Sequence, residues 1–231
     1  MDTMIKKAAA QAGHYYLPFV TSSIGVLIPL WILSELADQY FALGAKLAER
    51  GSPEQWMAQL GQLCTAVVVS FVLILLLPIR MDDLLKNRKP LRPWVGVANQ
   101  HGWPLFLEGL RMTAFVILWS LLLILPGIYK QIRYLFVPFV VLLDPQYHAG
   151  HVDALDRSSQ LTVGVFWWLV LLFAMSFGLE LGFEMLGQLH PALTHPTARV
   201  LTGGLSMLAS IYFYIWFFFI YEARSRQLES S

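Results

Sequence analysis

Long apolar segments without charged residues constrain this chain more than any other feature of its sequence. The stretch 67–77 contains no charged side chain at all. Only 13% of the 231 residues are charged and 57% are hydrophobic, whereas an average soluble domain carries roughly 25% charged residues. A soluble domain could not cover so much apolar surface with so few charges. The sequence therefore predicts an integral membrane protein whose excess apolar surface faces lipid.

The apolar segments predict the fold class. A helix needs about 20 apolar residues to cross a bilayer. We expect an all-α, polytopic transmembrane bundle of about six membrane helices, joined by short amphipathic interfacial helices, in a single membrane domain. The predicted spans cover residues 15–34, 56–79, 105–125, 128–143, 163–187 and 200–221. Lys6 and Lys7 precede the first span, which we interpret as a membrane helix and not as a cleaved signal.

The fourth segment, 128–143, leaves two alternatives open. As a helix it would be about 24 Å long, against a hydrocarbon core of about 30 Å. It is either a short tilted span, whose Lys130 and Arg133 side chains reach outward, or a re-entrant half-helix. We favour the span, because an even number of spans suits the charge distribution described next.

Basic residues predict the orientation. With the N-terminus in the cytoplasm, an even number of spans places most of the sixteen lysines and arginines on the inner side, where short loops of membrane proteins are enriched in them. Both termini are then cytoplasmic. This pattern is typical of a multi-pass protein of a bacterial cytoplasmic membrane.

Three shorter features complete the expected architecture. The stretch 36–47 is amphipathic and either lies on the membrane surface or extends the first span. Residues 51–55 carry a helix stop, a serine cap and a proline start. Residues 152–162 predict a short amphipathic helix that begins at Asp153.

The segment between the second and third spans is strongly basic. Lys86, Arg88, Lys89 and Arg92 could contact anionic lipid headgroups, each contributing about 1 kcal/mol near the membrane surface. The same basic residues are also sufficient to orient the chain in the membrane. Headgroup contact and orientation are compatible roles.

Two carboxylates in the fifth span form a candidate polar site. Glu180 and Glu184 lie four residues apart on one helix face, and acidic side chains inside a membrane usually face the protein interior or a water path. The functional hypothesis is a proton- or cation-handling pair, with Arg133, Lys130 or Arg199 as the candidate partner. The structural alternative is that both lie near the outer headgroups or form one ion pair.

Small residues on the same span form a candidate packing face. Gly178 and Gly182 have the four-residue spacing that lets two membrane helices approach closely. We favour packing within the bundle over a dimer contact. Gly203 and Gly204 in the sixth span are a candidate counterpart.

The loop after the fourth segment combines acidic and histidine side chains that resemble a metal site: Asp144, His148, His151, Asp153 and Asp156. A His-x-x-His spacing in a loop with proline and glycine fixes no ligand geometry. We interpret the group as a solvated loop, and we expect no metal and no cofactor.

Enzyme signatures and nucleic-acid signatures are missing from the sequence. It contains no Walker loop, no His-Glu-x-x-His, no Gly-x-Ser-x-Gly elbow and no Cys-x-x-Cys. The net charge of +1 supplies no basic field for nucleic acid. We expect a protein that is not an enzyme.

One stretch of the chain resembles a known family. It has a Leu-Pro-Gly-Ile turn at 125–128, Arg133, Pro138, Asp144 and then Ala-Leu, Ser-Ser and Phe-Trp pairs between 154 and 167. This pattern is similar to the YciC-type bacterial inner-membrane proteins and to the membrane domain that precedes some glycerophosphodiester phosphodiesterases. The resemblance covers about 124–168 and the six-span layout. It implies a bacterial membrane protein without assigned chemistry, and the phosphodiesterase activity does not carry over.

Three functional hypotheses follow. The first is a non-enzymatic bundle that supports or organises the membrane or a partner complex, through contacts with lipids, another membrane protein or itself. The second is a small transporter or lipid-handling protein that uses Glu180 and Glu184, because interrupted helices often line binding sites. The third, an intramembrane enzyme, has only the Asp/His loop in its favour.

Overall fold

The computed structural model describes residues 2–86, 94–189 and 196–229, and every regular element in these ranges is a helix. The all-α prediction is therefore confirmed. Within the described ranges, five helices are long and apolar enough to cross a membrane: Thr3–Leu47, Pro53–Leu85, Asn99–Leu122, Phe166–Phe183 and Val200–Glu229. By length and composition, the chain is built as a multi-pass membrane protein.

The first helix, α1 (Asp2–Leu47), extends beyond the predicted span at both ends. Pro18 and Pro29 both lie inside it. A proline leaves one backbone carbonyl without its usual helical donor and bends the helix. The stretch 36–47 continues α1 and is not a separate surface helix, which decides between the two alternatives that its sequence allowed.

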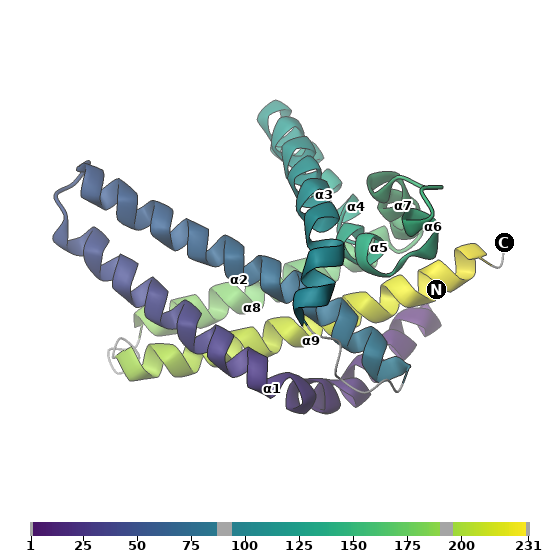
Figure 1. Cartoon of the computed structure of the whole chain (residues 1–231), viewed down its shortest axis with the longest axis horizontal. Coiled ribbons are helices and arrows are strands. Elements are labelled where there is room, and N and C mark those ends of the chain that lie inside the picture. Colours follow the sequence, from purple (N-terminus) through teal and green to yellow (C-terminus); the bar gives the residue numbers. More distant parts are fainter. Residues whose placement is uncertain (1, 87–93, 190–195, 230–231) are drawn as a thin grey trace.

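The second helix, α2 (Pro53–Leu85), begins as its sequence predicts. The Ser52 hydroxyl oxygen accepts the Gln55 backbone N–H at 3.3 Å, and Pro53 occupies the first turn. Gly51 has a φ of 79°, a conformation that favours glycine. With α1, α2 forms a long hairpin (Figure 1). The tip of the hairpin exposes large apolar side chains, namely Tyr40, Leu43, Leu47, Trp56 and Met57.

A second hairpin joins α3 (Trp94–Leu122) to α4 (Ile124–Arg133). Leu123 reverses the chain in an extended conformation, with φ −160° and ψ 141°. Gly127 allows the return, because a Cβ atom there would lie 2.9 Å from the Ser120 Cα. Figure 1 shows α3 crossing the other long helices steeply, with α4 folded back along it.

The fourth predicted span is where the structure differs from the sequence prediction. Residues 128–143 are divided between α4 and α5 (Val137–Leu143), with a turn at 134–136 between them. Pro138 lies in the first turn of α5, where its missing N–H costs nothing. Most of α5 is buried against protein. The segment 128–143 is therefore not one continuous helix but parts of two short ones, and the choice between a span and a re-entrant half-helix stays a prediction.

Two short helices follow, each started by an aspartate. The Asp144 side chain caps α6 (Pro145–His148), and the Asp153 side chain caps α7 (Ala154–Thr162). Aspartate is among the best residues for this position because its carboxylate accepts free backbone N–H groups. The amphipathic helix predicted at 152–162 is α7.

The last two helices, α8 (Phe166–Leu189) and α9 (Pro196–Glu229), form a third antiparallel pair. The aromatic part of α9 lies in the core. The Phe139 ring of α5 packs on three of its rings, with centroid distances of 5.1 Å to Tyr214, 5.9 Å to Phe218 and 5.4 Å to Tyr221. Burial of these large rings is the main apolar contact between α5 and the C-terminal helix.

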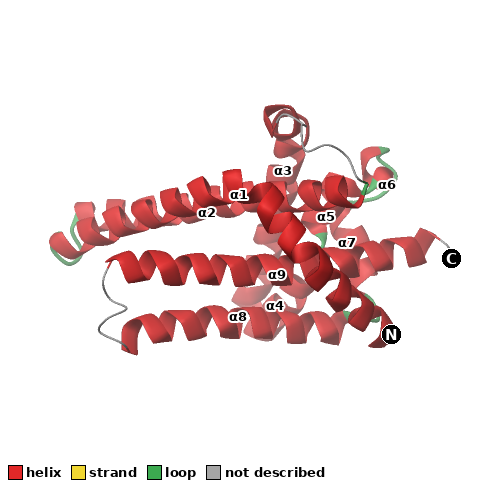
Figure 2. Cartoon of the chain, turned by 90° about the horizontal axis from the view of Figure 1, so that it is seen from below, coloured by secondary structure: helices red, strands yellow, loops and turns green. Residues whose placement is uncertain are grey.

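Both chain ends lie at the same end of the molecule, with the α1–α2 tip at the opposite end (Figures 1 and 2). Although α4 and α5 are short, together they return the chain from the far end of α3.

Candidate functional site

A buried ion pair lies where α5, α6 and α7 meet. The Arg157 Nε atom donates to the Asp144 carboxylate at 3.0 Å, and their side chains are 6% and 0% exposed. The other carboxylate oxygen of Asp144 accepts the Gln146 backbone N–H at 2.9 Å. Two buried charges are tolerated only when they are paired and hydrogen-bonded in this way.

The turn between α4 and α5 is bonded to α7. Arg133 Nη1 donates to the Ser159 carbonyl at 2.7 Å and to the Thr162 hydroxyl at 3.2 Å. The Ser158 hydroxyl donates to the Arg133 carbonyl at 2.9 Å and accepts the Phe136 backbone N–H at 3.2 Å. The turn leaves backbone groups outside any helix, and α7 supplies their partners.

The C-terminal helix closes this cluster. Arg224 of α9 donates from Nε to the Leu161 carbonyl at 3.2 Å and from Nη2 to the Val163 carbonyl at 2.7 Å. The last carbonyls of a helix have no partner within the helix, and a basic side chain is a favourable one. We call the set Arg133, Asp144, Arg157, Ser158 and Arg224 the polar core.

The polar core contains residues on which the family resemblance rests, because Arg133, Asp144 and Ser158 all belong to it. Sequence reasoning did not single out Arg157 or Arg224. Arg157 lies on the apolar face of α7 beside Ala154 and Leu161, so a charge in an otherwise apolar stripe was a usable signal.

Glu180 and Arg133, which were candidate partners of each other, bond to different groups in the structure. Glu180 is exposed and accepts a hydrogen bond from the Ser210 hydroxyl of α9 at 2.9 Å. Arg133 bonds α7, and its guanidinium lies 5.5 Å from the centre of the Tyr129 ring. The side chain of Glu184 lies outside the described part of the chain.

The candidate packing glycines of α8 lie in open space, whereas those of α9 contact another helix. A Cβ atom on Gly178 or Gly182 would have no neighbour within 4 Å. By contrast, a Cβ atom on Gly204 would lie 2.6 Å from the Trp31 ring of α1, and Gly203 lies against the Glu35 carboxylate. Close packing through glycine therefore occurs between α1 and α9.

Of the four candidate headgroup contacts Lys86, Arg88, Lys89 and Arg92, the structure describes Lys86. Lys86 follows the end of α2, forms an ion pair with Asp82 one turn earlier, and keeps half of its side chain exposed. Arg88, Lys89 and Arg92 lie outside the described residues, so contact with lipid headgroups stays a prediction.

The acidic and histidine residues of the loop have structural partners. Asp153 Oδ1 accepts the backbone N–H groups of Leu155 and Asp156, and its other oxygen pairs with Arg111 of α3. Burial raises the pKa of the Asp153 carboxyl, but the bond from Arg111 and the two N–H donors outweigh it, so that the pKa lies below its ordinary value.

The histidine of α6 contacts the protein on both sides. His148 Nε2 lies 2.9 Å from the Val141 carbonyl, and its ring lies 5.2 Å from that of His101 on α3. In the described ranges, no group of three or more His, Cys, Asp or Glu is arranged to hold a metal ion.

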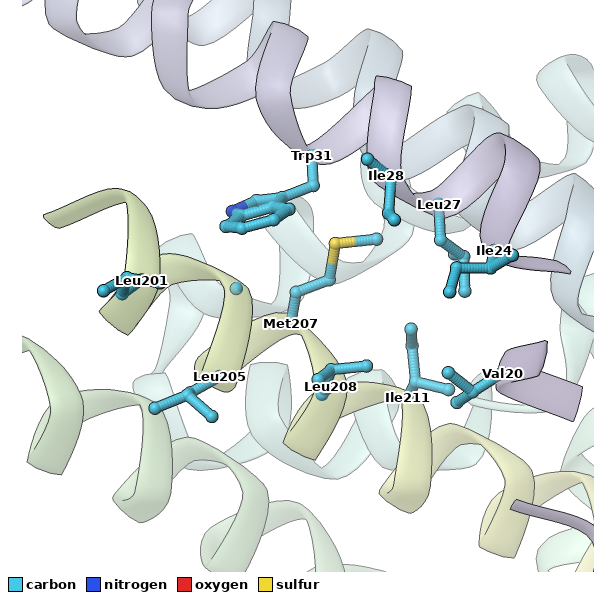
Figure 3. A pocket seen from close by; sticks show the side chains of 11 residues that line it. Val20, Ile24, Leu27, Ile28, Trp31, Leu201, Leu205, Met207, Leu208 and Ile211 are labelled. Carbon is cyan, nitrogen blue, oxygen red and sulfur yellow. The ribbon is translucent and has the colours of Figure 1, made fainter. Parts of the chain in front are cut away.

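An apolar groove of about 460 Å³ lies between α1 and α9 (Figure 3). Two contacts between the helices lie beside it. The Tyr16 hydroxyl donates to the Leu208 carbonyl at 3.0 Å, and the Trp31 ring packs on Gly204. The side chains that line it are Val20, Ile24, Leu27, Ile28, Trp31, Leu201, Leu205, Met207, Leu208 and Ile211.

The groove was not anticipated from the sequence. Its two signals were separate: the prolines of α1, which keep that helix from being straight, and the glycine pair of α9, which admits the Trp31 ring. No family model, no curated protein and no solved structure matches the chain.

Proposed function

We propose that the chain is a non-enzymatic integral protein of a bacterial cytoplasmic membrane, with both termini in the cytoplasm, that organises the surrounding lipid or supports a partner membrane complex. Its resemblance to the YciC-type proteins and the distribution of its basic residues support the bacterial location and the orientation.

The observation that carries the proposal is that the basic side chains of the polar core bond to groups of the protein itself. Arg133, Arg157 and Arg224 each donate to a carboxylate or to backbone carbonyls of neighbouring helices. Their hydrogen bonds join short helices that would otherwise separate, which is a structural use of charge. The longest apolar surfaces, in contrast, point outward on the two hairpins.

The exposed apolar tips of the α1–α2 and α3–α4 hairpins are suited to a scaffold protein. The α3–α4 tip exposes Leu121 and Leu125 by about four-fifths each, and the α1–α2 tip exposes Leu47 to the same degree. Exposed apolar patches of this kind mark surfaces that contact membrane or another protein. The α1–α2 and α3–α4 hairpins point in different directions (Figure 1).

The test is chemical cross-linking in intact bacterial membranes, followed by mild detergent extraction and mass spectrometry. A scaffold should yield either a reproducible protein partner or a self-cross-link through the α1–α2 or α3–α4 tip. Leu125→Lys and Leu47→Lys should each remove the cross-links at their own tip only. Recovery of the chain as an uncross-linked monomer with an unaltered lipid neighbourhood would contradict the proposal.

A lipid-handling function is the second candidate, and the α1–α9 groove favours it. It predicts that the protein, reconstituted in vesicles, accelerates lipid movement between leaflets above the rate of empty vesicles. Glu180→Gln tests the carboxylate hypothesis in the same assay, and Ser210→Ala, which removes only the hydrogen-bond donor, is its matched control.

A further inference from the structure

We infer that the turn between α7 and α8, residues 163–165, is a binding site for the phosphate group of an anionic phospholipid. The binding side chains are Lys130, Arg133 and Arg224, which form no ion pair with a carboxylate in the described ranges. The inference rests on the proposed membrane function and names the class of lipid that the protein would organise.

Two guanidinium groups lie on either side of this part of the chain. Arg133 of α4 and Arg224 of α9 both donate hydrogen bonds to groups of one five-residue stretch, 159–163. The acceptors are backbone carbonyls and one hydroxyl, which carry no net charge. These bonds therefore hold both side chains at the turn without neutralising them. Arg133 and Arg224 are each partly exposed, so an anion outside the protein can reach them.

Lys130 adds a third positive charge, one helical turn before Arg133. Its Nζ atom lies 5.5 Å from the centre of the Trp119 ring and 5.4 Å from that of the Tyr134 ring. The two ring faces attract the ammonium group but bring no negative charge. The ammonium group has three N–H donors for an oxygen acceptor, and the side chain is partly exposed.

The acidic side chains next to these elements are paired with other basic residues. Glu222, which precedes Arg224 on α9, forms an ion pair with Arg226. Asp153, at the start of α7, forms its ion pair with Arg111. A positive charge beside the hydrocarbon region is costly without a counter-charge. A bound anion would supply the charge that the protein does not.

The turn lies at the level of the lipid headgroups. The candidate span of α8 begins at Phe166, directly after the turn. Arg224 follows Tyr221, the last buried aromatic residue of α9, by one helical turn. Because α8 and α9 lie side by side as an antiparallel pair (Figures 1 and 2), the start of one meets the end of the other. Val163 and Trp167 are 53% and 79% exposed there, and tryptophan is enriched at this level.

A phospholipid phosphate fits these groups better than other membrane components. Arginine forms its strongest hydrogen bonds with phosphate and carboxylate oxygens, and basic pockets between membrane helices on the cytoplasmic side bind anionic headgroups. The choline group of phosphatidylcholine would bring a positive charge toward three others, whereas the glycerol group of phosphatidylglycerol is neutral. We therefore assign the site to a lipid with a net negative headgroup.

The experiment compares two photoreactive lipids. The full chain is reconstituted in phosphatidylcholine vesicles that contain a trace of phosphatidylglycerol or of phosphatidylcholine, each with a diazirine near its headgroup. After illumination, adducts on Trp167 and on Val67 are quantified by mass spectrometry. Val67 is exposed in the charge-free part of α2 and reports on bulk lipid. The ratio of phosphatidylglycerol to phosphatidylcholine labelling should be at least about fivefold higher at Trp167 than at Val67.

Four variants test the charges. Lys130→Gln removes a positive charge without breaking a hydrogen bond, and Val163→Glu adds a carboxylate at the turn while keeping both arginines. Each should lower the ratio at Trp167 about fivefold, the effect of one charge near the headgroups. Val163→Gln is the neutral control for the second change. Arg226→Gln removes a basic residue that is already paired with Glu222. Both controls should leave the ratio within about twofold.

The outcomes separate the site from the proposed function. Labelling at both residues with equal ratios at Trp167 and Val67, or equal ratios for Val163→Glu and Val163→Gln, overturns the phosphate site alone. Loss of the preference in excess inorganic phosphate, compared with chloride at equal ionic strength, overturns the lipid as the source of the phosphate. Absence of labelling at both residues with both probes overturns the membrane function and the site together.

Discussion

Removing the charge of Asp144 should destabilise the protein more than any other single change in the polar core. Asp144→Asn keeps a side chain that can cap α6, since asparagine is as good a cap as aspartate. It removes the partner of a guanidinium whose side chain is only 6% exposed. The variant therefore isolates the ion pair from the helix cap.

The expected magnitude follows from burial. Breaking a buried ion pair by removing one partner costs about 3–5 kcal/mol, because the remaining charge stays in a poorly solvated place. For a chain of this length, 1 kcal/mol corresponds to a shift in Tm of roughly 2–4 °C. Asp144→Asn should thus lower the Tm by about 6–20 °C. Arg157 Nη2 is already without a partner, which leaves this guanidinium little alternative bonding.

The assay is thermal unfolding of the purified protein in mild detergent, followed by loss of the monodisperse peak in size-exclusion chromatography. The double variant Asp144→Asn/Arg157→Met removes both charges and should recover at least half of the lost Tm. A change of less than about 2 °C for Asp144→Asn, or a double variant as unstable as the sum of the two single variants, would refute the buried-pair reasoning.

Further predictions concern packing, pH and topology. Gly204→Ala should cost about 1–3 kcal/mol in unfolding free energy because its Cβ meets the Trp31 ring. Gly182→Ala, whose Cβ meets nothing within 4 Å, should instead raise the unfolding free energy by about 0.5–1 kcal/mol, and thermal unfolding compares the two. The depressed pKa of Asp153 stabilises the fold above its ordinary value of 3.8, and this stability is lost as the pH falls through the folded pKa. Asp153→Asn should flatten the pH dependence of Tm in that range; an unchanged profile would contradict it. Cysteines at 52 and 225, in a protein without Cys64, should react with impermeant reagents from opposite sides of the membrane.

The helical character of the chain was predictable because hydrophobicity alone decides it. The start of α2 was also predictable, since Ser52 and Pro53 act within one helical turn. Both features depend on the hydrophobicity of the residues or on contacts within one helical turn, and these can be read from the sequence.

The helix break within the fourth predicted span could not be predicted from the sequence. Its apolar composition suits a span, but the helix breaks at 134–136 because Ser158 and Arg133 bond the turn to α7. Those partners lie about 25 residues away in the sequence, so hydropathy does not register them. The same applies to Arg133, whose predicted pairing with Glu180 required a helix contact that hydropathy does not specify.

The groove illustrates a second limit. A cavity is the part of a helix pair that side chains do not fill, and it depends on how two distant helices cross. In the sequence, Gly204 had only a local interpretation, as a small residue for helix packing, and it says nothing of the Trp31 ring that it meets. The groove that α1 and α9 form together exists only in three dimensions.

The reversal at Leu123 has a consequence for how the chain enters the membrane. Between Arg111 and Lys130 the sequence carries no charged residue, and the turn itself is satisfied by bonds from Leu123 N–H to the Trp119 carbonyl and from Gly127 N–H to the Leu123 carbonyl. Most hairpins must move a polar loop through hydrocarbon during insertion, at a cost of several kcal/mol for each unsatisfied group. The α3–α4 hairpin has no such loop to translocate, so it can enter and settle at its depth as one preassembled apolar unit.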